Sequence, residues 1–302
     1  MSYHGIISQD SDSALEQYCV TEEVFRQHLR FYRRRLEPVP VSTIVARVRE
    51  GRPLPPKWIA VTLDDALLSQ ATLAAEMLAS ERLPWALAVP AGLVEAKRTV
   101  WTYELRFLLR HAWQASTIPH PLDPTISLPT GRLRDRVDAA AALVPLLLQS
   151  ATRAQRSAYV DRLIDEVGRQ NFVQQLQEDR RFVLADWKLL RQLSQSGVEI
   201  LSHGYFHDPH NATLSVDEMR WELAASRQLL SERVGVQAKG FAFPNGTTIP
   251  ESAELLELAG YEFGLTSNLG RIECACTPWL LPRINAEYPL STLRDHLRAS
   301  SR

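Results

Sequence analysis

The sequence predicts an α/β protein with a parallel sheet. Short apolar runs alternate with segments whose apolar residues recur near a period of 3.6, which is typical of strands joined by crossover helices. Several of the apolar runs end directly in acidic residues or histidines. No fixed-period repeat and no low-complexity tract marks a boundary, so we expect one barrel-like domain over residues 1–302.

The elements follow from these patterns in order. Strands are expected where the apolar runs are short, at Trp58–Leu63, Trp85–Val89, Val198–Leu201, Gly240–Phe243 and Phe263–Thr266. Helices are expected where the longer period holds, at Glu22–Arg35, Leu68–Ser80, Ala185–Ser196, Val216–Arg233 and Ser252–Ala259. Residues 100–183 break this rhythm. The Pro-rich centre Ile118–Pro129 separates two helical portions without an obvious strand, which predicts a helical insertion within the domain.

Composition excludes several classes of function. The chain has 34 basic and 35 acidic side chains, so no net field attracts a nucleic acid or an anionic membrane. Five arginines between Arg26 and Arg35 have helical spacing and indicate a solvated helix face. Cys19, Cys274 and Cys276 are too few for a disulfide framework. The first residues lack the pattern of a signal peptide, and the apolar stretch Val137–Leu148 is too short to span a bilayer. We therefore expect no membrane span and a cytoplasmic location.

Two adjacent carboxylates, Asp64 and Asp65, follow the strand predicted at Trp58–Leu63. Active sites of parallel α/β folds are built where the carboxyl ends of strands meet. Neighbouring residues at a strand end point in different directions, so one acid can bind a cation while the other accepts a proton. A turn or a helix cap is the alternative reading of an isolated Asp-Asp pair.

Two histidines four residues apart, His203 and His207, follow the strand predicted at Val198–Leu201. On a helical turn this spacing places both imidazoles on one side, where they can reach a divalent metal at about 2.1 Å. A capping histidine and a polar loop without metal are the alternative. Together with one carboxylate, however, the two nitrogens make a three-ligand set with open positions, which a hydrolytic metal site requires.

A third strand end, Phe241-Ala242-Phe243-Pro244-Asn245-Gly246, turns sharply through Pro and Gly. The backbone N–H of Asn245 can there stabilise an oxyanion that develops when water attacks an amide carbonyl. An ordinary Pro-x-Gly turn is the alternative.

These segments resemble the polysaccharide deacetylases, carbohydrate esterase family four with the nodulation-type homology domain. Thr62-Leu63-Asp64-Asp65-Ala66 resembles the Thr-Phe-Asp-Asp-Gly motif of that family, and Gly197-x-Glu199-Ile200 with Ser202, His203 and His207 resembles its histidine motif. The opening Tyr3-His4-Gly5-Ile6, the pair Leu54-Pro55 and the Phe-Ala-Phe-Pro-x-Gly run resemble the branch that acts on exopolysaccharide-type substrates.

The resemblance implies a deformed (β/α)7-type TIM-like barrel that hydrolyses N-acetyl groups from amino sugars of a polysaccharide, oligosaccharide or glycan precursor. It implies that Asp65, His203 and His207 hold a divalent ion, zinc above all, and that Asp64 is the base for the attacking water. The implied partner is an N-acetylated glycan, and aromatic residues such as Trp101, Tyr205 and Phe206 can stack on its sugar rings.

The chain also departs from the family pattern. Ala66 replaces the motif glycine, and the arginine that many members carry before the third motif is missing beside Ala242 and Phe243. A Leu-x-His motif with the histidine acid is also absent, and Leu281-Pro282-Arg283-Ile284 resembles the other branch. His4, after a first strand, becomes the candidate acid, with a supporting role in the barrel mouth as the alternative.

Two other functions stay open at the level of the sequence. An amide hydrolase of the same fold can act on a formylated or cyclic amide, because a fold and a metal do not name the substrate. A glycan-binding protein without turnover is favoured by Ala66 and the missing acid, but it has no need of the base Asp64.

Overall fold

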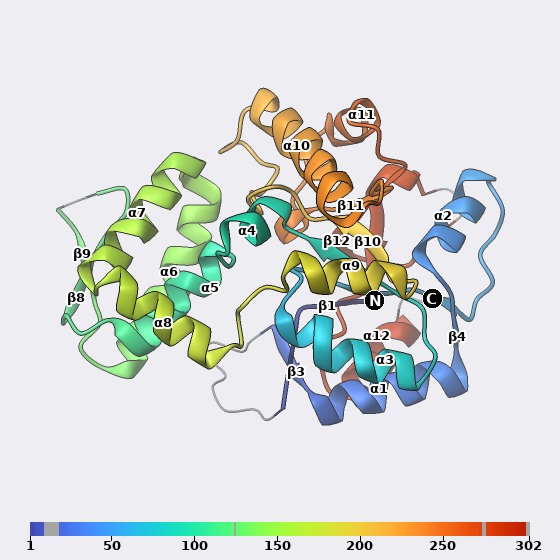
Figure 1. Cartoon of the computed structure of the whole chain (residues 1–302), viewed down its shortest axis with the longest axis horizontal. Coiled ribbons are helices and arrows are strands. Elements are labelled where there is room, and N and C mark those ends of the chain that lie inside the picture. Colours follow the sequence, from blue (N-terminus) through green and yellow to red (C-terminus); the bar gives the residue numbers. More distant parts are fainter. Residues whose placement is uncertain (9–17, 124, 274–275, 300–302) are drawn as a thin grey trace.

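A computed structural model describes residues 1–8, 18–123, 125–273 and 276–299. Its centre is a sheet of seven parallel strands that curls into a nearly closed barrel (Figure 1). The predicted fold class, an α/β protein with a deformed TIM-like barrel, is confirmed. Around the barrel the strands follow the order β1 (Ser2–Tyr3), β6 (Val61–Leu63), β7 (Trp85–Val89), β10 (Glu199–Ser202), β11 (Gly240–Ala242), β12 (Phe263–Leu269) and β13 (Leu281–Arg283).

The barrel closes through the two-residue strand β1. One edge of β1 pairs in parallel with β6, and Ser2 also forms a bridge to Asn285, just beyond β13. The Ser2 N–H donates to the Ile284 carbonyl at 3.0 Å, and the Ala286 N–H donates to the Ser2 carbonyl at 3.0 Å. The closure therefore depends on a short stretch of backbone at the start of the chain.

Strand β7 shows how side chains divide between the two faces of the barrel wall. Trp85, Leu87 and Val89 join the large core under the outer helices, whereas Ala86 and Ala88 belong to a smaller cluster with helix α2 (Val41–Arg49). This helix has no side-chain cap of its own. Instead, its first N–H groups, at residues 41 and 42, donate to the Glu199 carboxylate at 2.7 and 3.0 Å. Since Glu199 begins β10, helix α2 is fixed at the amino end of the barrel.

Most outer helices lie where the sequence predicts them. Three begin at side-chain caps, with Thr21, Asp186 and Ser215 each accepting from an N–H of the first turn. The segment expected at 68–80 starts as the π-helix η1 and continues as α3. The outer elements are α1 (Glu22–Arg35), η1 (Gln70–Ala74), α3 (Ala75–Ser80), α4 (Ala91–Ala96), α9 (Trp187–Gln195), α10 (Val216–Val234), α11 (Ser252–Leu258) and α12 (Leu290–Ala299).

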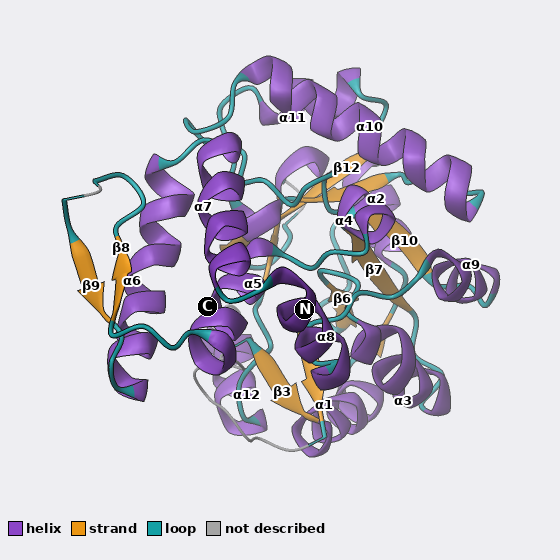
Figure 2. Cartoon of the chain, turned by 60° about the vertical axis from the view of Figure 1, so that its left-hand side comes forward, coloured by secondary structure: helices purple, strands orange, loops and turns teal. Residues whose placement is uncertain are grey.

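The predicted insertion forms a lobe with its own apolar core, seen at the left of Figure 1 and again in Figure 2. We expected no strand in the Pro-rich centre of the insertion, and this expectation was wrong. Strand β8 pairs there with β9 in antiparallel fashion. Ile118, fully buried in the lobe core, anchors this ribbon, which is too short to show a period. The lobe consists of α5 (Trp101–Phe107), η2 (Leu108–Ala112), β8 (Thr117–Pro119), β9 (Ser127–Pro129), α6 (Leu133–Ser150), α7 (Arg153–Glu166) and α8 (Arg169–Asp179).

Smaller differences concern the edges of the barrel. The strand expected at 58–63 divides at Ala60 into β5 and β6, because β5 pairs with β4 outside the main sheet. Strand β13 and helix α2 were not expected. The remaining elements are β2 (Gly5–Ile7), β3 (Cys19–Thr21), β4 (Glu37–Pro38), β5 (Trp58–Ile59), η3 (Pro244–Gly246) and η4 (Pro278–Leu280).

Two further expectations bear on the class of protein. Within the described part of the chain, no helix has the length and apolar character needed to cross a membrane. Among the described residues, Cys19 and Cys276 form no disulfide, and Cys274 lies outside the described residues. The organisation as one domain and the cytoplasmic location stay predictions.

Candidate active site

The carboxyl ends of the strands bring the predicted ligand residues together. Asp65 follows β6, whereas His203 and His207 follow β10, and one possible ligand atom from each lies within 4.8 Å of the others. The Asp65 Oδ1 atom is 3.3 Å from His203 Nε2 and 3.1 Å from His207 Nε2. All three side chains are buried. Residues 138 positions apart in the sequence, Asp65 and His203, thus converge as predicted.

The protonation of these side chains fits a bound cation. His203 Nδ1 lies 2.7 Å from the Ala242 carbonyl oxygen, which only accepts, so Nδ1 carries the proton. In the neutral ring, Nε2 then presents a lone pair to Asp65. Burial lowers the pKa of His207, which favours its neutral form as well.

His203 Nε2, the ring nitrogen without the proton, faces the Asp65 carboxylate at 3.3 Å, and two lone pairs at this distance repel unless a positive charge lies between them. Asp65 Oδ1 is buried without a hydrogen-bond partner, although a carboxylate oxygen normally finds one. A divalent cation removes both problems. The donor set of two imidazoles and one carboxylate suits zinc in particular.

The insertion supplies a further contact to the carboxylate of this cluster. Tyr103, on α5, donates its hydroxyl hydrogen to Asp65 Oδ2 at 2.7 Å, which leaves Oδ1 for the imidazole side. The Tyr103 hydroxyl is therefore placed to fix the rotation of the carboxylate. Sequence reasoning missed this residue, because nothing local distinguishes a tyrosine in an apolar helix.

The segment between the two histidines is a loop, so the expected helical turn is wrong. Gly204 and His207 both have positive φ, 79° and 60°, which no helix allows. The loop is held from behind by Glu222 on α10. Its Oε2 atom accepts the backbone N–H groups of Tyr205 at 2.7 Å and Phe206 at 3.0 Å. The imidazoles thus meet through a compact loop instead of helical periodicity.

Buried charges extend this support to the insertion. Arg153, on α7, pairs with Asp208 and also approaches Glu222 at 3.0 Å, while Arg156 pairs with Asp208 at 2.5 Å. Asp208 directly follows His207. The network therefore connects the histidine loop to helices from two parts of the fold.

Asp64, the predicted base, has an arginine partner that the sequence analysis did not assign. Arg283, on β13, donates to Asp64 Oδ1 at 2.8 Å and to Oδ2 at 2.7 Å, and both side chains are 3% exposed. The same guanidinium donates to Thr62 Oγ1 at 3.0 Å and to the Thr266 carbonyl at 2.9 Å. Burial alone would raise the pKa of Asp64, but Arg283 lowers it to about 2.

The arginine that many family members carry before the third motif is missing from this chain. Arg283, from strand β13, lies beside Asp64 instead. The run Leu281-Pro282-Arg283-Ile284 carried this signal in the sequence. Without the barrel closure between β1 and β13, however, nothing relates residue 283 to residue 64.

The backbone at the aspartate pair is strained where glycine was expected. Asp65 has φ 81° and Ala66 has φ 55°, and Ala66 is fully buried. Left-handed backbone at a residue with a side chain costs on the order of 1 kcal/mol or more. The motif position thus does require positive φ, and Ala66 adopts it.

His4 lies in the barrel mouth, as expected from its place after β1. Its ring Nδ1 is 2.5 Å from Glu287 Oε1, which also accepts the His4 backbone N–H at 2.7 Å. The side chain is 27% exposed. Burial alone would lower the pKa of His4, but the carboxylate of Glu287 raises it to about 10. His4 is therefore a protonated imidazole at neutral pH.

Asn245 occupies the turn η3 after β11. Its backbone is left-handed, with φ 55° and ψ 10°, a conformation that asparagine tolerates better than most residues. Gly246 follows with φ 66°, and a Cβ there would lie 2.4 Å from the Ser267 Cβ. Glycine at position 246 is thus required by the close approach of the η3 turn to strand β12.

The six predicted site residues all line one pocket of about 350 Å³, a volume within the range of small-molecule sites. The predicted stacking residues Trp101, Tyr205 and Phe206 are not among the lining residues. Tyr18 lines the pocket, with its ring 5.8 Å from that of His4. The pocket is lined by side chains that include His4, Tyr18, Asp64, Asp65, Tyr103, Arg106, His203, His207, Phe243, Asn245 and Ser267.

Fold and site together define a class before any comparison. A parallel barrel that presents two imidazoles and a carboxylate beside a second, ionised carboxylate at its carboxyl rim carries the groups that metal-assisted hydrolysis requires.

Comparisons with known proteins narrow this class to a family. The family model for polysaccharide deacetylase matches residues 160–264, which include both histidines of the cluster. Over this part of the chain, the resemblance to polysaccharide deacetylases that the motifs predicted is confirmed. Comparison with curated protein sequences gave no match.

Solved structures agree with the fold over nearly the whole chain. The Streptococcus pyogenes deacetylase PplD in complex with acetate has a TM-score of 0.62 at 15% identity, covering 97% of this chain and 95% of its own. IcaB from Ammonifex degensii has a TM-score of 0.61 at 16% identity, with coverages of 100% and 96%. A de-N-acetylase from Aggregatibacter actinomycetemcomitans has a TM-score of 0.57 at 14% identity, with coverages of 98% and 98%. At these identities the likeness concerns the fold.

Proposed function

We propose that this protein is a metal-dependent hydrolase that removes N-acetyl groups from amino sugars of a glycan of the exopolysaccharide type. The observation that carries the proposal is the cluster of Asp65, His203 and His207 beside the Arg283-bound carboxylate of Asp64. The family assignment supports glycan deacetylation, and two structures of the same fold bear the names deacetylase and de-N-acetylase.

In this proposal, Asp65, His203 and His207 hold a divalent cation, with zinc as the preferred ion. When bound, such a cation polarises the acetyl carbonyl and makes water more acidic. Asp64 accepts a proton from the attacking water. Because Arg283 holds the pKa of Asp64 at about 2, the base is ionised at every pH near neutrality.

The remaining residues act on the carbonyl oxygen and the leaving nitrogen. As water forms the new C–O bond, the backbone N–H of Asn245 faces the developing oxyanion. His4, protonated through its pair with Glu287, then gives a proton to the sugar nitrogen as the C–N bond breaks. The products are acetate and a free amine.

Acetate release from N-acetylglucosamine oligomers tests this function. The zinc-loaded protein is expected to release acetate, and Asp64→Asn is expected to lower kcat by at least about 10³-fold while the protein keeps its metal. Formylated and cyclic amides complete the substrate panel. Turnover confined to those amides would replace the substrate class, and metal-loaded protein without any product on acetylated glycans would favour a binding protein.

A further inference from the structure

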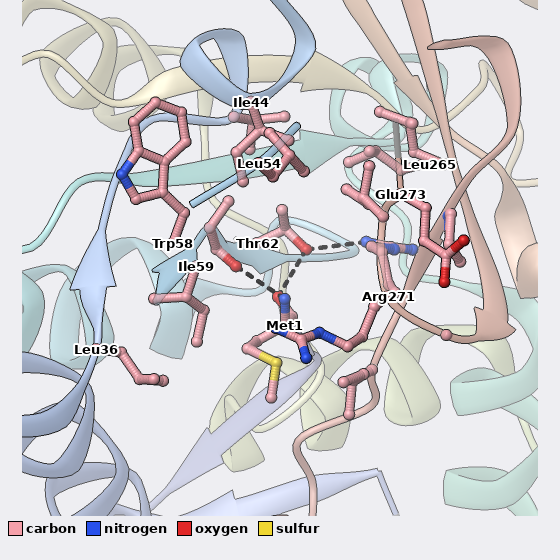
Figure 3. Close-up of a pocket in the computed structure, with 18 of the residues that line it drawn as sticks. Met1, Leu36, Ile44, Leu54, Trp58, Ile59, Thr62, Leu265, Arg271 and Glu273 are labelled. Atoms are coloured by element: carbon pink, nitrogen blue, oxygen red, sulfur yellow. Dashed lines mark hydrogen bonds between the residues drawn. The ribbon is translucent and has the colours of Figure 1, made fainter. Parts of the chain in front are cut away.

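A second pocket, shown in Figure 3, lies toward the amino ends of the barrel strands, and Arg283 but not Asp64 is among its lining residues. Its volume is about 550 Å³, larger than that of the catalytic pocket, and the two share no lining residue. It is bounded by helix α2, by the start of β6, by β13 and by residues 270–273. The mechanism proposed above leaves this pocket unused.

The walls of this second pocket are mainly apolar. Pro53, Pro55 and Pro56 form a stiff section of chain along one side, and Trp58 presents its indole nearby (Figure 3). Apolar cavities of this kind take up hydrocarbon in preference to ordered water. The remaining apolar lining includes Leu36, Ile44, Leu54, Ile59, Leu265 and Leu281.

The polar groups of the pocket indicate an occupant without a buried charge. Thr62 and Arg283, at the inner end, already bond to each other, and Arg283 also holds Asp64. The Met1 amino group there donates to the Ala60 carbonyl at 2.8 Å, and burial lowers its pKa to about 5, so it is uncharged at neutral pH. Arg271 and Glu273 bring opposite charges to the exposed side, where Arg271 donates to the Pro56 carbonyl at 3.1 Å (Figure 3). An uncharged chain therefore complements the interior, and a polar end group belongs beside Arg271 and Glu273.

We infer that this pocket binds the hydrocarbon chain of a neutral single-chain lipid, with its hydroxyl end at the mouth. The inner end of the chain lies against Thr62 and the guanidinium of Arg283. Because Arg283 lines the pocket and holds Asp64, a chain that contacts its guanidinium alters the position of the Arg283–Asp64 pair and changes the rate of hydrolysis. The effect on the rate of hydrolysis rests on the proposed function, whereas the binding of the chain does not.

Quenching of tryptophan fluorescence by 11-bromoundecan-1-ol tests the binding directly. The chain has seven tryptophans, and Trp58 lines the pocket. Saturable quenching is expected in the wild-type protein and in Trp221→Phe, whose indole is exposed on α10 away from the pocket. The saturable part is expected to be lost in Trp58→Phe. Equal quenching in all three proteins would overturn the site.

A matched pair of leucine variants locates the occupant and separates the two proposals. Leu54→Gln, in the half-buried pocket wall, is expected to weaken the affinity for undecan-1-ol about ten-fold or more, whereas Leu258→Gln, on an exposed helix face, leaves it unchanged. Both residues are in accessible positions, so folding is retained. Equal affinities in the two variants would overturn the site.

Saturating undecan-1-ol is expected to change kcat for acetate release in the wild type and not in Leu54→Gln. An unchanged wild-type kcat would overturn the coupling, and absence of acetate release without the alcohol would instead overturn the proposed function.

Discussion

Replacement of Arg283 by methionine removes the cation that holds the predicted base. In the wild type, the pKa of Asp64 falls from its ordinary value of 3.8 to about 2, which corresponds to about 2 kcal/mol of stability at neutral pH. Because the folded pKa lies below the unfolded one, this stabilisation is present above about pH 4 and is lost as the pH falls through about 2.

In the variant, burial is opposed only by the charges of His203 and His4, so the pKa of Asp64 is expected to rise above its wild-type value. Loss of one partner from a buried pair typically costs about 3–5 kcal/mol, because the other charge stays buried without compensation. Arg283→Met is therefore expected to lower the free energy of unfolding at pH 7 by about this amount. The deficit is expected to be smaller at pH 4, where more of the carboxylate in the variant is protonated.

Urea unfolding of a double-mutant cycle measures this coupling. Asp64→Asn combined with Arg283→Met is expected to be less destabilised than the sum of the single variants by about 2 kcal/mol or more. Arg220→Met is the control, because its ion pair with Asp217 is exposed and contributes little. Additive single effects, or a deficit at pH 4 equal to that at pH 7, would refute the reasoning.

Three further perturbations probe the other parts of the site. Glu287→Gln removes the carboxylate that raises the pKa of His4, so the alkaline limb of the kcat/KM profile is expected to move from near pH 10 toward pH 7; an unmoved limb would exclude His4 as the acid. Tyr103→Phe removes the hydrogen bond to Asp65 Oδ2 and is expected to weaken zinc affinity about ten-fold or more by calorimetric titration, and an unchanged affinity would deny Tyr103 a positioning role. Ala66→Gly relieves left-handed backbone at φ 55° and is expected to raise the free energy of unfolding by up to about 1 kcal/mol, whereas destabilisation would show that Ala66 is not strained.

The sequence predicted the parts of the fold that have local periodicity. Helix α1 occupies the predicted range, and β7 does so as well, because each is long enough to display its period. The three-residue strands β8 and β9 carry no such pattern. Their pairing depends on Ile118, which is buried only because the lobe folds around it.

The sequence predicted the site residues that directly follow strands, and it did not predict those that come from other parts of the fold. Asp65 and His203 could be recognised in the sequence because they follow apolar runs, and the structure places their side chains 3.3 Å apart. Arg283 reaches Asp64 through the barrel closure, and Tyr103 reaches Asp65 through the insertion, and both of these are tertiary features. The loop geometry at His207 was also hidden, because four-residue spacing fits a helix and a tight loop equally well.

Zinc content per chain, measured after dialysis for the wild type and two aspartate variants, tests the central claim most directly. We predict about one zinc ion per chain in the wild type and in Asp64→Asn, and almost none in Asp65→Ala. Equal zinc in Asp65→Ala and the wild type, or no zinc in a folded wild-type protein offered the ion, would contradict the account.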